Sequence, residues 1–264
     1  MKKYTIIPFP KKSVITFSGE KVVLPIKLQK KIDVYWNSLM KKKKHYTKDS
    51  MFTISKRSIT EKELNITVDE TDYAHYLYSK DNDRSFVHAV KFIHTMSIVI
   101  TNDNKIIIGR MGAHTAHAGM MQMCGGGLDK NDLRGRTLCV EDNIARELKE
   151  ELNIDISNLD VVSFHKPMFI VYNHAAVQVT AVFITKISVL EKEFKIKYNN
   201  FQNEIKKKGN LPEFEKIFFL ENNKKEINIF LNNRNIRSSD AFKRVLAFWS
   251  ITKHNTVLKS KKIF

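Results

Sequence analysis

The chain has little cysteine and no long apolar run. Only two of its 264 residues are cysteines, Cys124 and Cys139, and their spacing fits neither a disulfide framework nor a metal knuckle. The apolar run near the N-terminus is broken by Pro8 and Pro10, so it is too short for a signal-peptide core. No stretch approaches the roughly 18 apolar residues of a membrane-spanning helix. We therefore expect a soluble, cytoplasmic protein with reduced thiols and no membrane partner.

Acidic residues are few compared with basic ones. The chain has 28 Asp and Glu against 45 Lys and Arg, which gives a formal net charge of +17. A field of this sign attracts polyanions. The lysines are spread along the whole chain, however, and this is also typical of a lysine-rich solvated surface. Charge alone therefore leaves nucleic acid and a small polyphosphate open as ligands, without selecting either.

Glycine is scarce as well, yet three of the nine glycines stand together at 125–127. A strand-like run precedes them, and a loop after them leads to residues 146–154, which are mostly good helix formers. In a helix, Glu147, Glu150 and Glu151 occupy positions i, i+3 and i+4 and share one face. The order predicted here is strand, glycine turn, loop and acidic helix.

Three carboxylates on one helical face repel each other by a few tenths of a kcal/mol per pair. A divalent cation removes that cost, and Mg²⁺ in particular is held by carboxylates together with substrate phosphates. A phosphate-bearing substrate is then the natural second ligand. The alternative is that the three glutamates are simply a solvated face, which is common in helices of this composition.

The glycine turn and the acidic helix together resemble the Nudix box of the Nudix hydrolases, G-x5-E-x7-R-E-U-x-E-E-x-G-U, in which U is aliphatic. The helical half matches at Arg146, Glu147, Leu148, Glu150, Glu151 and Ile154. Asn153 stands where the family has glycine, and Asn tolerates the left-handed conformation of a helix end best after Gly. The resemblance implies an α+β fold, with a mixed β-sheet sandwiched between helices.

The loop half of the box departs from the family pattern. Gly126 and Arg146 are 20 positions apart (146 − 126), whereas the pattern needs 14, so the loop carries six extra residues. The first box glutamate is thereby displaced. Its place falls on Asp132 when counted from the glycines and on Leu138 when counted back from Arg146. Only the aspartate could do the work of an acid, and the sequence leaves this position open.

Residues 1–85 resemble the N-terminal extension of the UDP-glucose-hydrolysing branch of the family. Two short strands are expected within residues 4–24, with a turn at Ser18-Gly19. An amphipathic helix carrying Trp36 begins near Pro25 and ends in a lysine run at 41–44, and alternating strands follow at 51–55 and 64–68. We therefore predict a β-rich extension over 1–85, shaping the substrate pocket, and a Nudix domain over 86–264.

The second region shows further strand and helix signals. The sequence predicts a hairpin over 89–110 that turns at Asn102-Asp103-Asn104, a long hairpin over 161–187, a strand over 213–220 and a final helix capped at residues 238–240. Residues 190–209 form an insertion by family standards. Its aromatic residues have helical spacing, and the sequence assigns it no role.

The resemblance implies a Mg²⁺- or Mn²⁺-dependent pyrophosphohydrolase whose substrate is a nucleoside diphosphate linked to another moiety, a UDP-sugar or other nucleotide sugar being preferred. Its implied metal ligands are Glu147, Glu150, Glu151 and the backbone of Gly126. Its implied catalytic residues are Glu150, Arg146, which is placed to orient Glu150, and Glu215. Family members commonly draw one more ligand or base from outside the box, and Glu213 and Glu215 both qualify by position.

Substrate contacts are expected from Arg110, His117 and Gly125. His114 and His117 form a His-x-x-His pair, but no further ligands stand at usable spacing, so substrate contact or solvation is preferred over zinc.

Three alternatives remain open. An RNA 5′-end pyrophosphohydrolase uses the same box and would account for the basic charge through salt-dependent RNA binding. A non-catalytic Nudix-fold binding module would account for the lengthened loop, although the intact run 146–151 disfavours it. A structural protein with an accidental acidic helix is the third. The sequence leaves a homodimer open.

Overall fold

The computed structural model describes residues 3–42, 46–82 and 86–259 of the chain, with side chains as far as Thr252. The chain forms two compact units. Unit 1 consists of Met1–Thr95, Gly125–Ile144 and Pro167–Ala181, and unit 2 of Met96–Cys124, Ala145–Lys166 and Val182–Phe264. Neither unit ends at the predicted boundary between residues 85 and 86, and the division into extension and catalytic domain stays a prediction.

The strands form two sheets. One has the order β1-β10-β11-β5-β6-β12, with β7 paired to β6, and the other has the order β3-β4-β2-β9-β8. The strands of the first sheet are β1 (Tyr4–Pro8), β10 (Val162–Asn173), β11 (Gln178–Ile187), β5 (Ile93–Ile100), β6 (Lys105–Met111), β12 (Phe214–Glu221) and β7 (Met121–Gln122). Those of the second are β3 (Ser50–Ile59), β4 (Glu63–Asp72), β2 (Lys12–Lys21), β9 (Thr137–Leu138) and β8 (Leu133–Arg134).

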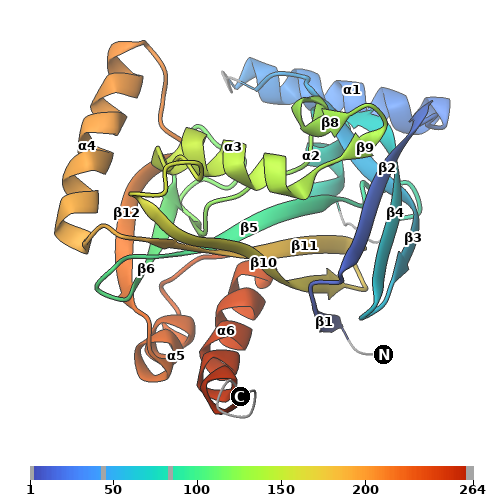
Figure 1. The fold of residues 1–264 in the computed structure, drawn as a ribbon. Helices are drawn as coiled ribbons and strands as arrows, with labels where there is room; N and C mark the ends of the chain where they lie inside the picture. The colour runs from blue at the N-terminus through green and yellow to red at the C-terminus, as the bar shows by residue number, and fades with distance from the viewer. Residues whose placement is uncertain (1–2, 43–45, 83–85, 260–264) are drawn as a thin grey trace. The chain divides into compact units, whose positions relative to one another are not determined.

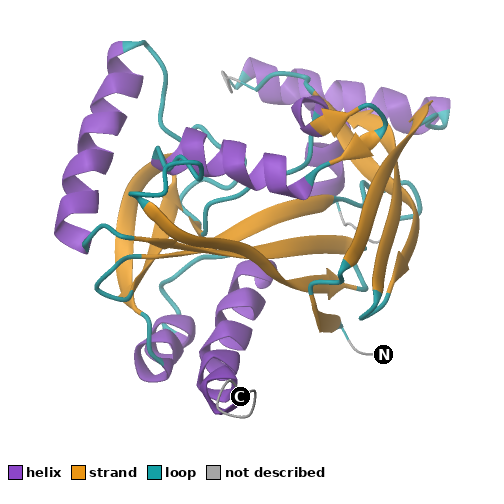
Figure 2. Ribbon diagram, in the orientation of Figure 1, coloured by secondary structure: helices purple, strands orange, loops and turns teal. Residues whose placement is uncertain are grey.

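Six α-helices and a short 3-10 helix complete the described residues. They are α1 (Ile26–Lys41), α2 (Tyr73–Asp81), η1 (Lys130–Asp132), α3 (Val140–Leu152), α4 (Glu191–Lys207), α5 (Lys224–Asn232) and α6 (Asp240–Lys259). Mixed sheets combined with helices confirm the predicted α+β class (Figure 2). Within the described part of the chain, no helix has the length and apolar character needed to cross a membrane.

The N-terminal strands of unit 1 follow the alternation that the sequence predicts. On β4, Leu64, Ile66 and Val68 are buried, whereas Asn65 and Thr67 between them are partly exposed. Successive side chains of a strand point to opposite faces, so β4 gives one face of the sheet to the core. The strand pairs in parallel with β2 and antiparallel with β3.

The turn predicted at Ser18-Gly19 is wrong. Strand β2 continues through both residues to Lys21, and its pairing with β4 shifts register between Phe17 and Lys21. Gly19 has a φ of +90°, which glycine adopts without steric cost, so the chain forms a bulge within the strand where a turn was expected. The strand expected at residues 22–24 is absent from the structure, which describes these residues as irregular.

Helix α1 begins directly after Pro25, as predicted, and buries Ile32. The lysine run at its end falls partly on Lys43 and Lys44, which lie outside the described residues. Helix α2 was not predicted, although its start signal is visible in the sequence: the Asp72 carboxylate accepts a hydrogen bond from the backbone N–H of His75, as an N-cap residue does.

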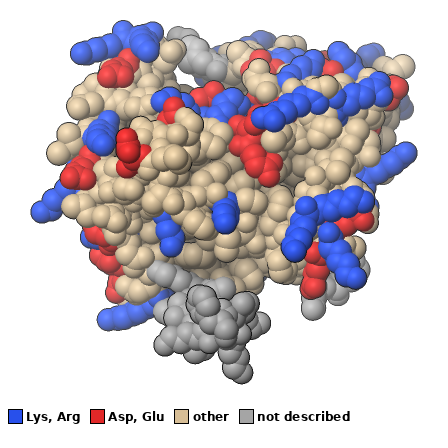
Figure 3. Space-filling view, viewed as in Figure 1, with Lys and Arg blue, Asp and Glu red and all other residues tan. Residues whose placement is uncertain are grey.

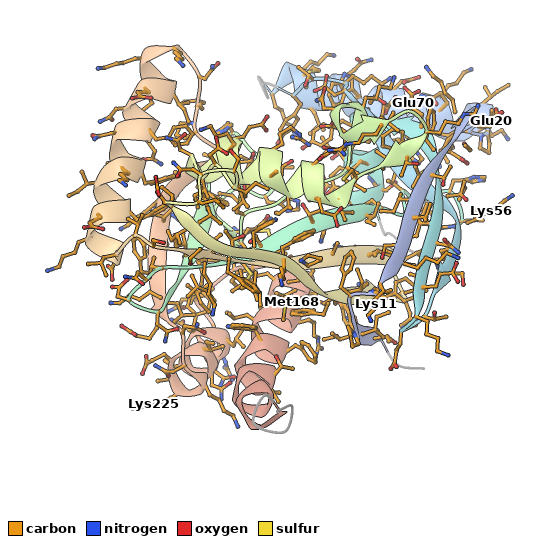
Figure 4. All side chains as sticks on the ribbon, viewed as in Figure 1. Lys11, Glu20, Lys56, Glu70, Met168 and Lys225 are labelled. Carbon is orange, nitrogen blue, oxygen red and sulfur yellow. The ribbon has the colours of Figure 1, made fainter. Side chains whose placement is uncertain are left out.

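The lengthened loop is an ordered part of unit 1. Its residues form η1 and the short hairpin of β8 and β9, and Thr137 of β9 pairs with Thr16 of β2. The Lys130 ammonium also contacts the Glu70 carboxylate of β4 at 2.7 Å, where the loop meets the sheet (Figure 4). The residues absent from the family pattern therefore extend the N-terminal sheet.

Unit 2 contains the predicted strand 213–220, which is β12 and pairs antiparallel with β6. The hairpin turn after β5 is confirmed at Asn104, whose φ is +62°. Helix α6 begins at the predicted cap, because the Ser239 hydroxyl accepts the N–H of Phe242. Helices α5 and α6 lie on the side of the unit 2 strands opposite the C-terminal part of α3 (Figure 1). Helix α5 was not predicted.

The left-handed conformation of Asn153, at the C-terminal end of α3, can be tested by substitution. Asn153 has a φ of +54°, a conformation that Asn tolerates because its short polar side chain bonds locally, so Asn153→Ala should lower the free energy of unfolding by about 1 kcal/mol. Asn153→Gly should stay within about 0.5 kcal/mol of wild type, because glycine relieves strain but adds freedom to the unfolded chain. Urea unfolding of both variants measures the difference. Equal losses would contradict this account.

The ion pair between Lys130 and Glu70 attaches the loop to β4, and its contribution to stability can be tested by varying the pH. The Lys130 ammonium, aided by the Ser50 hydroxyl, lowers the pKa of Glu70 below its ordinary value against the opposing effect of burial. The ionised carboxylate thus stabilises the fold above pH 4.5, and this contribution is lost as the pH falls through the folded-state pKa. Glu70→Gln should lower the free energy of unfolding by about 1–2 kcal/mol at pH 7 and by progressively less as the pH falls below 4.5. A loss independent of pH would contradict the ion-pair role.

Candidate active site

The predicted acidic helix is α3, and its C-terminal part from Ala145 onward belongs to unit 2. Glu147 and Glu151 are 8% and 5% exposed, whereas Glu150 is exposed. Lys, Glu, Arg and Asp are almost never buried without partners. Two of the three glutamates therefore do not form a solvated face, and that alternative reading of the helix is wrong for them.

Arg146 is the positive partner of this helix. One of its terminal guanidinium nitrogens lies 3.0 Å from Glu147 Oε1 and 3.2 Å from Glu150 Oε2. The predicted contact between Arg146 and Glu150 is present, and a second contact reaches the more buried Glu147. Charge-assisted hydrogen bonds of this kind fix the orientation of both carboxylates. A catalytic role for Arg146 and Glu150 stays a prediction.

A fourth carboxylate, that of Glu213, lies within the electrostatic reach of Glu150. The residue precedes β12 and is exposed. Desolvation of the carboxyl group by neighbouring protein atoms raises the pKa of Glu213, and the negative charge of Glu150 raises it further. We refer to Glu147, Glu150, Glu151 and Glu213 as the carboxylate cluster. It joins α3 to the start of β12 within unit 2.

The thiol of Cys124 lies among the same acids. It is 2% exposed, and burial raises its pKa well above the ordinary value, with Glu151 as the next cause and Glu147 and Glu213 as smaller ones. Cys124 therefore carries a neutral thiol next to three members of the carboxylate cluster. Both cysteines are free, as the sequence predicts.

Cys124 directly precedes the glycine turn, whose first residues belong to unit 1. Gly125 has a φ of +144°, which favours glycine, and the Gly126 carbonyl accepts the N–H of Thr95 on β5. The Gly127 carbonyl accepts a hydrogen bond from the side-chain amide of Asn143 at 3.0 Å. The turn is thus attached both to a strand and to the first turn of α3.

Asn143 is the polar centre of that attachment. It is fully buried, and its amide nitrogen also donates to Asp132 Oδ2 at 3.0 Å, while its amide oxygen accepts from the Thr95 hydroxyl. Asp132 is 1% exposed and additionally accepts the backbone N–H of Asp129 at 2.8 Å. Asp132, one of the two positions considered for the first box glutamate, therefore holds the loop to the helix.

Leu138, the other position considered, is 3% exposed and belongs to the core of unit 1. Its apolar side chain has no oxygen to offer a metal ion, as the sequence indicated. The structural bonds of Asp132 do not test whether it also binds an ion, so the replacement for the first box glutamate stays open.

The remaining predicted site residues lie in unit 2. Arg110 on β6 pairs with Glu215 on β12 at 2.5 Å, with both side chains about two-fifths exposed. Exposed pairs of this kind contribute about 0–1 kcal/mol. His117 lies in the loop between β6 and β7, where its carbonyl accepts the N–H of Met120. The charge of Glu150 raises the pKa of Glu213, whereas the partner of Glu215 is Arg110.

The carboxylate cluster offers only oxygen donors, and such donors fit Mg²⁺ or Mn²⁺. As the side chains lie, however, no group of three His, Cys, Asp or Glu residues in the described part of the chain could hold a metal ion. Arg146 accounts for part of this arrangement, because it engages Glu147 and Glu150 at once. The donor chemistry fits a hard divalent ion, and binding would require these carboxylates to reorient.

Sequence reasoning missed Cys124, Asn143 and the polar residues of α4. Asn143 stands four residues before Glu147, so the two share a face of α3, and that spacing was a usable signal. Cys124 stands next to the first glycine of the turn. Nothing in the sequence indicates that α4 contacts β12, because this contact depends on tertiary packing.

The anchor formed by Asn143 can be tested by a nearly isosteric change. Asn143→Asp replaces the amide donor by an oxygen beside Asp132, so two buried acceptors meet where a hydrogen bond stood. We expect the free energy of unfolding to fall by about 2–4 kcal/mol. Asn131→Asp, at an exposed position of the same loop, is the matched control and should change stability by less than about 0.5 kcal/mol. Similar losses in both variants would disprove the anchor.

No protein-family model matches the chain, and no curated protein matches it. Several solved structures resemble parts of it. A Nudix hydrolase from Nitrosomonas europaea is 14% identical, with a TM-score of 0.39 over 62% of this chain and 73% of that one. A Nudix-family hydrolase from Clostridium perfringens is 11% identical, with a TM-score of 0.34 over 62% and 98%. The Nudix hydrolase RenU from M. smegmatis is 8% identical, with a TM-score of 0.37 over 64% and 87%. All three TM-scores lie below 0.5, so the function proposed below rests on the chain's own residues.

Proposed function

We propose that this protein is a Mg²⁺- or Mn²⁺-dependent pyrophosphohydrolase of the Nudix type, acting on a nucleoside diphosphate linked to another moiety. One observation carries the proposal. Glu147 and Glu151 are buried on the same helix as the exposed Glu150, and the charge of Glu150 also raises the pKa of Glu213 on another element. Burying like charges together is costly unless cations neutralise them.

A divalent ion bound here supplies positive charge that offsets the diphosphate and lowers the pKa of a bound water. Glu147, Glu150 and Glu151 are the proposed ligands. Arg146 would release part of its hold on Glu150 when that carboxylate turns to the ion. It would keep Glu147 oriented meanwhile, because the two residues are adjacent on α3.

Glu213 is the proposed acceptor of the proton from the attacking water. Its carboxyl lies within the electrostatic reach of Glu150 on a separate element, so it can contact a group held by the helix. A general base must lie within hydrogen-bond reach of the proton that it removes. We prefer Glu213 to Glu215 in this role because the Glu215 carboxylate is paired with Arg110.

Nucleotide sugars such as UDP-sugars are the preferred substrates, with Arg110, His117 and Gly125 as proposed contacts. An RNA 5′ end is the second candidate, and the net charge of +17 favours it. On the face drawn in Figure 3, Lys and Arg side chains are scattered, with acidic side chains among them. A scattered basic surface argues for a small substrate, because a bound polyanion is better matched by a continuous basic stripe.

The test is turnover of UDP-sugars, ADP-ribose, dinucleoside polyphosphates, nucleoside triphosphates and 5′-triphosphate RNA, with Mg²⁺ or Mn²⁺ and with a chelator. Wild-type protein should release nucleoside monophosphate from a nucleotide sugar, and the chelator should abolish the release. Glu150→Gln should lower kcat/KM by at least about 10²-fold, because a neutral amide is a poor ligand for a hard ion. Glu141→Gln, at an exposed position of the same helix, should leave it unchanged.

The panel also separates the alternatives. If only RNA 5′ ends are hydrolysed, and RNA binding weakens steeply as the salt concentration rises, the protein is a hydrolase whose substrate is RNA and not a nucleotide sugar. Binding of nucleotides without turnover would indicate a non-catalytic module. Wild-type activity in Glu150→Gln would remove the proposed site altogether.

A further inference from the structure

Helix α4, for which the sequence suggests no role, directs two buried side chains at one backbone carbonyl of β12. The Tyr198 hydroxyl donates to the Phe214 carbonyl at 3.0 Å, and the side-chain amide of Gln202 donates to the same oxygen at 2.7 Å. The Gln202 amide also donates to the Tyr198 hydroxyl at 3.1 Å. Tyr198 and Gln202 are 2% and 9% exposed. Two donors use both lone pairs of this carbonyl, so its direction is fixed.

The carbonyl held in this way belongs to the peptide between Phe214 and Glu215, one residue after Glu213. The peptide between Glu213 and Phe214 is held as well, because the Glu213 carbonyl accepts the N–H of Gly112 at 2.8 Å. The Phe214 ring is almost fully buried against Gly109, where an added β-carbon would lie 2.3 Å from the ring. The backbone around Glu213 is therefore held by contacts from α4, from β6 and from the loop after β6.

The pairing of β12 with β6 changes at this point. Its register shifts between Phe214 and Lys216, which is a β-bulge. Bulges occur next to active sites because they redirect side chains. A bulge also weakens the regular ladder, so the orientation of the residues beside it depends on additional bonds. Tyr198 and Gln202 supply two of these bonds.

Tyr198 also lies within the electrostatic reach of the carboxylate cluster. Burial raises the pKa of its hydroxyl, and the charge of Glu151 raises it further. Figure 1 shows α4 beside β12, and the Phe194 ring of α4 packs edge-on against Phe219 of β12 with 6.4 Å between ring centres. Helix α4 therefore contacts β12 both through an apolar ring contact and through side-chain hydrogen bonds.

From this geometry we infer that α4 is a positioning element for Glu213. Tyr198 and Gln202 fix the Phe214 carbonyl, and with it the backbone from which the Glu213 side chain projects. They are positioning residues, because their hydrogen bonds reach the backbone of β12 and not the carboxylates. The inference rests on the proposed function, in which Glu213 and Glu150 act on the same bound ion and water.

Mn²⁺ binding without substrate tests the inference, measured by electron paramagnetic resonance on the full chain. Tyr198→Phe with Gln202→Met removes both donors and keeps similar volumes. We expect the Kd for Mn²⁺ to rise about 10-fold or more, as it does when outer-sphere partners are lost. Glu213→Gln should raise it similarly, and the triple variant should be no worse than Glu213→Gln within about 2-fold, since coupled residues are not additive.

Trp249→Phe is the control, because it removes a buried side-chain hydrogen bond to Asn222 elsewhere in unit 2. It should leave Mn²⁺ affinity unchanged. A metal-independent measurement is hydrogen exchange of the Gly112 amide, which should become at least 10-fold faster in the double variant. The amide of Thr101, bonded to the Lys105 carbonyl in the same unit, should keep its protection.

The outcomes separate the two claims. If the wild type binds Mn²⁺ and the double variant binds it as tightly, the inference is overturned and the proposed function stands. Loss of affinity that persists in full on the Glu213→Gln background would also overturn it, since the effect would then not pass through Glu213. If the wild type binds no Mn²⁺, the proposed function fails, and unchanged Gly112 exchange would show that the two donors do not hold this peptide either.

Discussion

The constraint on which the site depends is the burial of like charge. Glu147 and Glu151 are withdrawn from water one turn apart on α3, and the Cys124 thiol remains neutral beside them. Arg146 compensates by bonding to two of the helix carboxylates. A fold gains nothing in stability from such an arrangement, because an apolar helix face would pack more favourably. The arrangement is understandable if a divalent ion and a phosphate-bearing substrate share the site.

Hydrogen bonds within unit 1 fix the glycine turn. This turn follows Cys124 and is attached to Thr95 of β5 and, through Asn143, to the start of α3. Asp132 connects the same asparagine to the loop that leads to α3. This loop builds a hairpin on the N-terminal sheet and is an ordered element.

Helix α4 contacts β12 through apolar and polar side chains of one face. Its aromatic stripe buries Phe194 and Tyr198, as helical spacing predicts. The same face carries Gln202, and Tyr198 and Gln202 both donate to the Phe214 carbonyl. Gln202 stands four positions after Tyr198, so the two side chains lie on the same face of α4.

The sequence by itself determined the local structure. The make-up of α3, the left-handed Asn153, the helix start at Pro25, the turn at Asn104 and the serine cap of α6 all follow from short-range backbone preferences. The turn predicted at Ser18-Gly19 is wrong, because Gly19 makes a bulge inside β2. Helices α2 and α5 were not predicted. Only tertiary structure paired Glu215 with Arg110 and left Glu213 within the electrostatic reach of Glu150, because the two acids have equal claims by position. Tertiary structure also decided the roles of Asn143, Tyr198 and Gln202, since their partners are 11 to 48 residues away in sequence. Long-range contacts of this kind leave no periodic signal in the chain.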